Sequence, residues 1–195
     1  MKMTETGLAG LQDVHLDRID DDRGHLMRIF DALEWAPRGD AVTAWDQVVT
    51  SYTATKNTLR GMHYQLPPYA EGKLVLPLAG TMHWASVDVR PDSATFGRWH
   101  GTTLKAGEGS ALAATPGFAH GCLSLSRDVT LLILSSQTHR ADSGAGFCWN
   151  DPKVGIGWPD LGAPPHLSTA HRRLPRFDAF AEQLGVVRER EAVHA

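Results

Sequence analysis

The sequence predicts an all-β protein made of short antiparallel strands, and three observations support this. Short segments with strand-like composition recur along the chain, separated by turn residues. Glycine and proline interrupt the chain so often that we expect no long helix before about residue 170. The segment Leu78-Ala79-Gly80-Thr81 has the composition of a tight hairpin. Strands joined in this way are typical of an antiparallel sandwich or barrel.

Seven segments are expected to be strands, namely 46–55, 59–65, 72–78, 81–90, 97–104, 110–115 and 129–136. In the segment 81–90, His83, Ala85, Val87 and Val89 share one side. Because Val87 and Val89 are apolar, we expect this side to be the packed one.

The C-terminal part of the chain differs from the rest. Phe177, Phe180, Ala181 and Leu184 have the spacing of an amphipathic helix, which begins after Pro175 and ends near Gly185. We expect it to pack on the sheet or on a partner subunit. Residues 188–191 alternate in charge and are expected to be solvated. The whole chain, 1–195, is expected to form one domain, with a core at about 20–160 and a C-terminal extension at about 165–195.

Composition excludes several classes of protein. The 195 residues are 42% apolar and 21% charged, which is typical of a globular domain, and the net charge of −3 gives no basic field for nucleic acid. Two cysteines are too few for a disulfide scaffold and are expected to be reduced. No segment reaches the ~20 apolar residues of a membrane span, and the first residues lack a signal-peptide pattern. We therefore expect a cytoplasmic protein with no membrane or nucleic-acid partner.

The densest group of polar residues lies at 59–68 and is followed by Glu71-Gly72-Lys73. On a regular strand Arg60 and His63 point to opposite faces, but a bulge at Gly61 makes them converge. A histidine beside fixed cations suits the removal of a proton next to a carbonyl, because the cations stabilise the enolate. The alternative is a half-buried strand with an incidental histidine.

A second group, at 115–121, is expected to be a loop that ends with His120 aimed into a barrel. Gly109, Gly117 and His120 resemble the second motif of cupins, which are small jelly-roll barrels that often bind a metal through histidines. The first cupin motif supplies a His-x-His pair, but here the sequence is His63-Tyr64-Gln65. Because two histidines alone seldom hold a divalent ion, we expect no metal. His120 has either a structural or a supporting catalytic role.

Several motifs in order resemble one family, the dTDP-4-dehydrorhamnose 3,5-epimerases, which act on nucleotide-bound 4-keto-6-deoxy sugars. The resemblance implies a cupin-like jelly roll, a homodimer, and neither metal nor organic cofactor. The motifs cover most of the chain and are Asp22-Arg23-Gly24, Gln47 with Ser51, the segments 59–65 and 71–75, Val87-Asp88-Val89-Arg90, the segment 116–121, Trp149-Asn150-Asp151-Pro152 and Trp158-Pro159.

The resemblance also implies roles for individual residues. His63 corresponds to the base that removes the proton at carbon 3 or carbon 5, with Lys73 and Arg60 near the keto oxygen. One ketone at carbon 4 acidifies both neighbouring C–H bonds, so one base can serve two epimerisations. Substrate binding, including the nucleotide diphosphate, is expected from Arg23, Arg28, Gln47, Gln65 and His120.

The chain departs from the family pattern where protons are transferred. The tyrosine that delivers the second proton falls on Ile133, which has no proton to give, and a second tyrosine falls on His139. The aspartate that orients the base falls on His171, which supplies no full negative charge, so the base should be weaker. We expect His171 to orient His63, and His139 or water to replace the missing acid.

Other departures lie around the expected nucleotide site, where Arg28, Val49 and Leu26 replace a Glu, an Asn and a Phe of the family. The leading hypothesis is an isomerase that epimerises a nucleotide-activated 4-keto-6-deoxy sugar at carbon 3, carbon 5 or both, through an enolate. One alternative is a paralogue that enolises another anionic ketone and ends in elimination or isomerisation. The other is a catalytically silent binding protein of the same fold.

Overall fold

The structure, a computed structural model, describes residues 1–31 and 44–185. Its elements in chain order are β1 (Lys2–Glu5), β2 (Leu11–His15), β3 (Arg18–Asp21), β4 (Gly24–Met27), β5 (Gln47–Thr53), β6 (Leu59–Gln65), β7 (Lys73–Ala79), β8 (Thr81–Asp88), β9 (Trp99–Lys105), β10 (Ser110–Ala114), β11 (Phe118–Ser124), β12 (Val129–Ser135), the short 3-10 helix η1 (Ala141–Ser143), β13 (Gly144–Gly146), α2 (Thr169–Arg172) and α3 (Phe177–Gln183).

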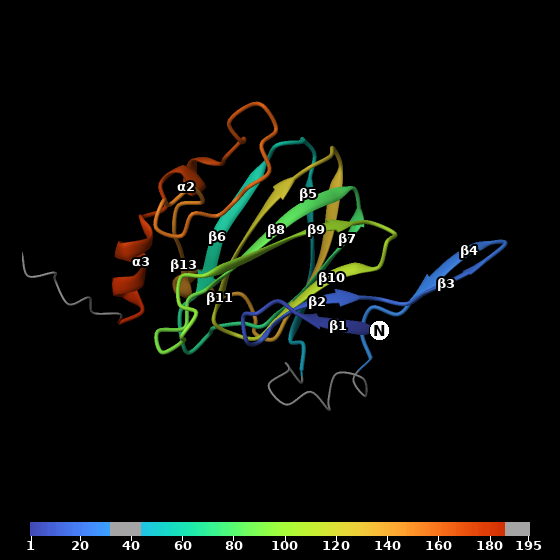
Figure 1. The fold of residues 1–195 in the computed structure, drawn as a ribbon, viewed down its shortest axis with the longest axis horizontal. Helices are drawn as coiled ribbons and strands as arrows, with labels where there is room; N and C mark the ends of the chain where they lie inside the picture. The colour runs from blue at the N-terminus through green and yellow to red at the C-terminus, as the bar shows by residue number, and fades with distance from the viewer. Residues whose placement is uncertain (32–43, 186–195) are drawn as a thin grey trace, which may run out of the picture.

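Two antiparallel sheets form the body of the molecule (Figure 1). One has the strand order β1-β2-β10-β7-β12-β5 and the other the order β13-β6-β11-β8-β9. Their facing sides enclose an apolar core that includes Leu11, Val75, Trp84, Leu112 and Phe118. The expected all-β antiparallel barrel is therefore confirmed.

All seven expected strands are present, each within two residues of its predicted ends. The expectation for the segment around His120 was wrong, because Phe118–Ser124 is strand β11 and not a loop. It lies between β6 and β8, and all of its residues are buried. In the sequence Gly121 suggested a loop. In the structure it lies in a strand where a side chain has no room, since a Cβ at this position would lie 2.5 Å from Met62 Sδ.

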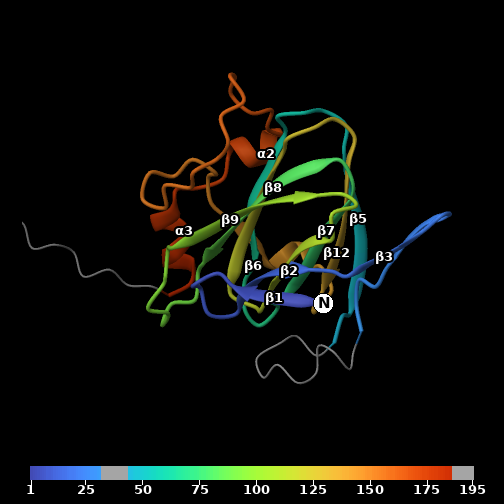
Figure 2. The ribbon, with the colours of Figure 1, turned by 45° about the vertical axis from the view of Figure 1, so that its right-hand side comes forward.

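Both faces of β8 are packed, although the sequence led us to expect only one. Met82 and Trp84 point into the core between the sheets. Val87 lies on the other face, in a cluster with Phe177 and Phe180 of α3. The predicted C-terminal helix is thus present and packs on the five-stranded sheet, and in two views α2 and α3 lie on one side of the barrel (Figure 1 and Figure 2). Residues 188–191 lie outside the described part.

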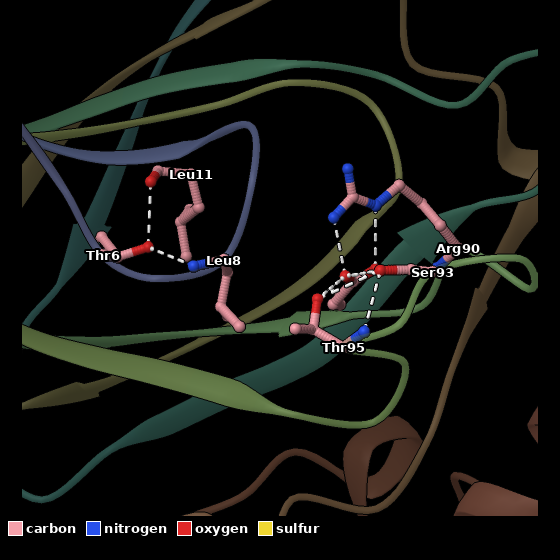
Figure 3. A network of polar contacts seen from close by, with 7 residues as sticks. Thr6, Leu8, Leu11, Arg90, Ser93 and Thr95 are labelled. Atoms are coloured by element: carbon pink, nitrogen blue, oxygen red, sulfur yellow. Dashed lines mark hydrogen bonds and ion pairs between the residues drawn. The ribbon is translucent and has the colours of Figure 1, made fainter.

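A buried carboxylate joins the end of β8 to the loop that follows it. Asp88 is fully buried and accepts hydrogen bonds from Arg90, Ser93 and Thr95 at 2.6–3.0 Å. Figure 3 shows Arg90, Ser93 and Thr95 gathered at this point. Burial alone would raise the pKa of Asp88, but the hydrogen bonds, chiefly from Arg90, outweigh it and hold this pKa at about 2.

We expect Asp88→Asn to lower the free energy of unfolding at pH 7 by about 2 kcal/mol, because a pKa depressed on folding stabilises the charged form. In the wild type this contribution is present above about pH 4 and is lost as pH falls towards 2. Urea unfolding at pH 7 and pH 3 measures the difference. Asp142→Asn removes an exposed partner of Arg140 and should change stability little. Equal losses in the two variants would contradict the prediction.

Both cysteines, Cys122 and Cys148, are free, as expected. Within residues 1–31 and 44–185, no helix has the length and apolar character that crossing a bilayer requires.

Candidate active site

A cavity of about 500 Å³ lies between the two sheets. The five-stranded sheet contributes Arg60, His63 and His120, and β7 of the facing sheet contributes Lys73. His171 of α2 and the loop residue His139 also line the cavity. The structure therefore brings together all five predicted catalytic residues and two of the predicted substrate-binding residues, His120 and Gln65.

A bulge in β6 aligns two of these side chains. In the pairing of β11 with β6, His120 faces His63 and Cys122 faces Arg60, so β6 holds one more residue than its partner over this stretch. The backbone at Gly61 has φ of +122°, a value that suits glycine. The extra residue turns Arg60 and His63 to the same face, which confirms the bulge predicted at Gly61.

Gly61→Ala should therefore disrupt the site as well as the fold. A Cβ at this position would lie 2.6 Å from Gly121 Cα and 2.7 Å from His120 O, both backbone atoms of the neighbouring strand. Together with the positive φ, this should cost about 3 kcal/mol of stability. Thermal unfolding tests it, and Gly107→Ala is a control because that glycine also has positive φ but no atom close to its Cβ position. Equal losses of stability in Gly61→Ala and Gly107→Ala would show that the contact with Gly121 is unimportant.

His63 contacts a second histidine. The Nε2 atoms of His63 and His171 are 2.6 Å apart, and the ring centroids are 4.7 Å apart. Ser168 positions His171, because its hydroxyl accepts a hydrogen bond from the His171 backbone N–H at the start of α2. His171 thus lies where the sequence placed it, against the predicted base.

The surroundings of His63 favour its neutral form. Burial of the ring is the largest cause that lowers its pKa, followed by the nearby His171, Lys73, Arg60 and His139, and together they bring this pKa to about 4. The side chain is reached by solvent through the cavity, although protein groups surround it. At neutral pH the imidazole therefore carries a lone pair that can accept a proton. Burial and the charge of Arg60 also lower the pKa of His171.

Two cations flank the imidazole on opposite sheets. Arg60 donates hydrogen bonds to Thr53 Oγ1 at 3.1 Å and to the Tyr52 carbonyl at 3.0 Å, which fix its guanidinium. Lys73 Nζ lies 2.6 Å from Glu71 Oε1 and 3.4 Å from Ser135 Oγ. A substrate oxygen that gains negative charge in this cavity therefore meets fixed positive groups.

His120 is held as a neutral hydrogen-bond donor. Its Nδ1 lies 3.3 Å from Trp84 Nε1 and 3.0 Å from Ser86 Oγ. Because an indole N–H can only donate, Nδ1 is the acceptor and the ring proton is on Nε2. That Nε2 is buried and has no partner within the described residues. Burial, and then Lys73 and His63, lower the pKa of His120 well below its usual value, so the ring stays neutral.

Part of the cavity wall, on the six-stranded sheet, is apolar. Ile133 and Leu131 of β12 line it, and neither carries a transferable proton. His139 lies at the same cavity, and its backbone N–H donates to Gln47 Oε1 at 2.7 Å. Gln47 therefore lies next to His139 of the cavity, but its side-chain oxygen is occupied by the His139 backbone N–H.

Gln65 also lines the cavity, although its amide is engaged by the backbone. Its Nε2 donates to the Tyr69 carbonyl at 3.1 Å, and its Oε1 accepts from the Arg140 N–H at 2.6 Å. The two ends of this buried amide thus join the loop after β6 to the segment before η1. The sequence had suggested contact with substrate and gave no signal for these backbone bonds.

Arg23 and Arg28 do not reach the cavity of their own chain. Arg23 lies in the turn between β3 and β4 and pairs with Asp21, and its side chain is 85% exposed. Arg28 follows β4 and pairs with Asp31. The β3–β4 hairpin projects away from the barrel (Figure 1).

Among the described residues, no group of three or more His, Cys, Asp or Glu side chains is arranged to hold a metal ion. The functional features that sequence reasoning missed are Glu71 as the partner of Lys73, and Trp84 with Ser86 as the partners of His120. Glu71 stands two residues before Lys73 on the printed sequence, and this spacing was a signal that could have found it.

A jelly-roll barrel that encloses a neutral imidazole among cations defines a cupin-like protein with an acid–base site. A model of the dTDP-4-dehydrorhamnose 3,5-epimerase family matches residues 5–179. The chain belongs to this family, whose members are cofactor-independent sugar-nucleotide epimerases.

Three relatives illustrate the similarity. A dTDP-4-dehydrorhamnose 3,5-epimerase of Sinorhizobium fredii is 32% identical over 161 residues, which cover 83% of this chain and 82% of the relative. A Legionella pneumophila 3,5-epimerase in complex with dTDP-4-keto-L-rhamnose superposes with a TM-score of 0.88 at 28% identity, covering 94% of this chain and 96% of that one. A 3'-monoepimerase of Streptomyces bikiniensis in complex with dTDP-quinovose superposes with a TM-score of 0.82 at 30% identity, covering 92% of this chain and 89% of that one. The cupin-like jelly roll is thereby confirmed.

Proposed function

We propose that this protein is an isomerase that epimerises a dTDP-activated 4-keto-6-deoxy sugar at carbon 3, carbon 5 or both, in the biosynthesis of a glycan or natural product. The observation that carries the proposal is the position of His63, a neutral imidazole in a cavity with Lys73, Arg60 and His120. The sugars named for the relatives support the substrate class. No relative described above supports elimination or silent binding.

In the proposed mechanism His63 removes the proton next to the ketone. For its ring to act as a base while Nε2 contacts His171, Nε2 donates to His171 and the lone pair is on Nδ1. The charge that develops on the carbon 4 oxygen is stabilised by the Lys73 ammonium, the Arg60 guanidinium and the unpartnered Nε2–H of His120. No group outside the chain is needed for this step.

Inversion also requires a proton on the opposite face of the enolate. Ile133 cannot supply it, so the family acid is missing from this site in our interpretation. His139 lines the same cavity and carries an ionisable ring, and we assign the delivery of this proton to His139, with water as the other source. The activity of the protein thus uses a different proton donor from the tyrosine that the family pattern contains.

Replacing His171 tests the pairing of the two histidines. We expect His171→Asp to raise the pKa of His63 above its present value of about 4, because a carboxylate stabilises the imidazolium. The acid limb of the pH–rate profile should move to higher pH, since the base must be neutral to act. A base stronger by one pKa unit should increase proton exchange at pH 7 by up to about tenfold. His171→Asn is the matched control, and equal rates in the two variants would contradict the prediction.

We propose that the protein acts as a homodimer and that the β3–β4 hairpin enters the partner. Ile19 and Leu26 on this hairpin are 67% and 68% exposed, and Val48 and Tyr52 on the edge strand β5 are 58% and 57% exposed. Pairing the hairpin of one copy with β5 of the other covers both surfaces. In this proposal Arg23 and Arg28 of the partner subunit contact the diphosphate of the substrate, since neither lines the cavity of its own chain. Light scattering should give a dimer, and Leu26→Asp should give monomers; a monomeric wild type would contradict the proposal.

The function itself is tested by incubating the protein with dTDP-4-keto-6-deoxyglucose in deuterated water. The proposal predicts loss of the carbon-bound proton signal at carbon 3 or carbon 5 in the NMR spectrum, together with a new stereoisomer. Exchange without a new isomer shows that the base acts but the opposite-face donor does not. Absence of exchange at both carbons would overturn the proposal.

A further inference from the structure

The cavity contains a carboxylate that the mechanism above does not use. Among the residues that the structure describes, Glu71 is the only acidic side chain that lines the cavity. Its Oε1 lies 2.6 Å from Lys73 Nζ, and the two side chains are 13% and 16% exposed. A buried ion pair with this geometry resists separation, because removing one partner leaves an uncompensated charge.

The contacts of Lys73 account for two of its three ammonium protons. One proton is directed to Glu71, and the second lies near Ser135 Oγ at 3.4 Å. Ser135 faces Lys73 across the pairing of β12 with β7, so this contact comes from the same sheet. The third proton is left for a group in the cavity, which is where the substrate ketone is proposed to bind.

Without Glu71, no described residue of opposite charge lines the cavity to hold the ammonium. The other charged group is the Arg60 guanidinium, which repels it. The remaining titratable groups of the described lining are four imidazoles, a phenol and a thiol, namely those of His63, His120, His139, His171, Tyr64 and Cys122. Lysine has a flexible four-carbon stem, so the ammonium can take several positions unless a partner restrains it. Arg60 is anchored by the Thr53 hydroxyl and the Tyr52 carbonyl, whereas among the described residues Lys73 has only this carboxylate and the longer contact with the Ser135 hydroxyl.

We propose that Glu71 is a positioning residue: its carboxylate fixes the Lys73 ammonium at the point where the enolate oxygen of the substrate gains its charge. Glu71 acts through Lys73 and does not touch the substrate. The expected effect on catalysis rests on the proposed epimerase function. The position of the Lys73 ammonium does not depend on that function.

The kinetic test uses the deuterium exchange assay with dTDP-4-keto-6-deoxyglucose. Glu71→Gln keeps the shape of the side chain and removes its charge, and should lower kcat for exchange about tenfold with KM within about twofold, since a misplaced group affects the transition state most. In the Lys73→Met background the same change should alter the rate by less than about twofold. Glu108→Gln is the control, because Glu108 pairs with Lys105 on the surface. An unchanged kcat, or a tenfold loss in both backgrounds, would overturn the proposal.

A second measurement separates this proposal from the function it rests on. Proton–nitrogen NMR of the lysine ammonium groups, without substrate, should show a separate Lys73 signal at low temperature, because an ion pair in a cavity slows exchange of its protons with water. The signal is assigned by its absence in Lys73→Met and should be lost in Glu71→Gln. If it persists unchanged in Glu71→Gln, the proposal is wrong even where the enzyme is active. If it is lost while the wild type exchanges no deuterium, the positioning stands and the epimerase function fails.

Discussion

His63→Ala should abolish proton exchange at the sugar, lowering its rate by about 10³-fold, within the usual contribution of a general base. The His63 imidazole is neutral at pH 7 and lies in the same cavity as Lys73 and Arg60, which stabilise the enolate. Alanine leaves the cavity open and takes away the lone pair. Exchange is followed by NMR in deuterated water with dTDP-4-keto-6-deoxyglucose.

Two controls make this result specific. His15→Ala removes an exposed histidine at the end of β2, outside the cavity, and should leave the rate unchanged. Calorimetry with dTDP should give equal affinities for the wild type and His63→Ala, because the base acts on the sugar and not on the nucleotide. A His63→Ala variant that exchanges at the wild-type rate would assign the base elsewhere.

Lys73→Met should lower the exchange rate by about 10²-fold, because removing one group that stabilises an oxyanion has a cost of this size. Methionine keeps most of the apolar stem and removes the ammonium. The single variant leaves Glu71 without its partner at 13% exposure, which should also lower stability. The double variant Glu71→Gln/Lys73→Met removes both charges and should recover thermal stability but not activity. Recovery of activity in the double variant would contradict the role assigned to Lys73.

Much of the fold could be predicted because strand and helix signals are local. Phe177, Phe180, Ala181 and Leu184 have helical spacing, and the structure contains the helix α3 there. The bulge at Gly61 was predictable because glycine interrupts an otherwise regular strand. Strand β11 was missed, since Gly117 and Gly121 suggested a loop. The glycines are needed by close neighbours from other segments, Arg90 and Met62, and such tertiary contacts leave no local signal.

The members of the site could be predicted more easily than their interactions. Family motifs placed His63, Lys73 and His171 in one cavity, and the structure brings them together there. The sequence alone could not show that Trp84 fixes the ring proton of His120, because Trp84 lies 36 residues away on another strand. It also could not show that the turn with Arg23 projects away from its own cavity, since that depends on the direction of the β3–β4 hairpin.

A crystal structure of this protein with a bound dTDP-4-keto-6-deoxy sugar tests the central claim most directly. The account predicts a ring nitrogen of His63 about 3–3.5 Å from carbon 3 or carbon 5, as a reactive arrangement requires. The carbon 4 oxygen should lie between Lys73 Nζ and His120 Nε2. A sugar bound outside the cavity, or with its ketone turned towards Leu131 and Ile133, would contradict the account.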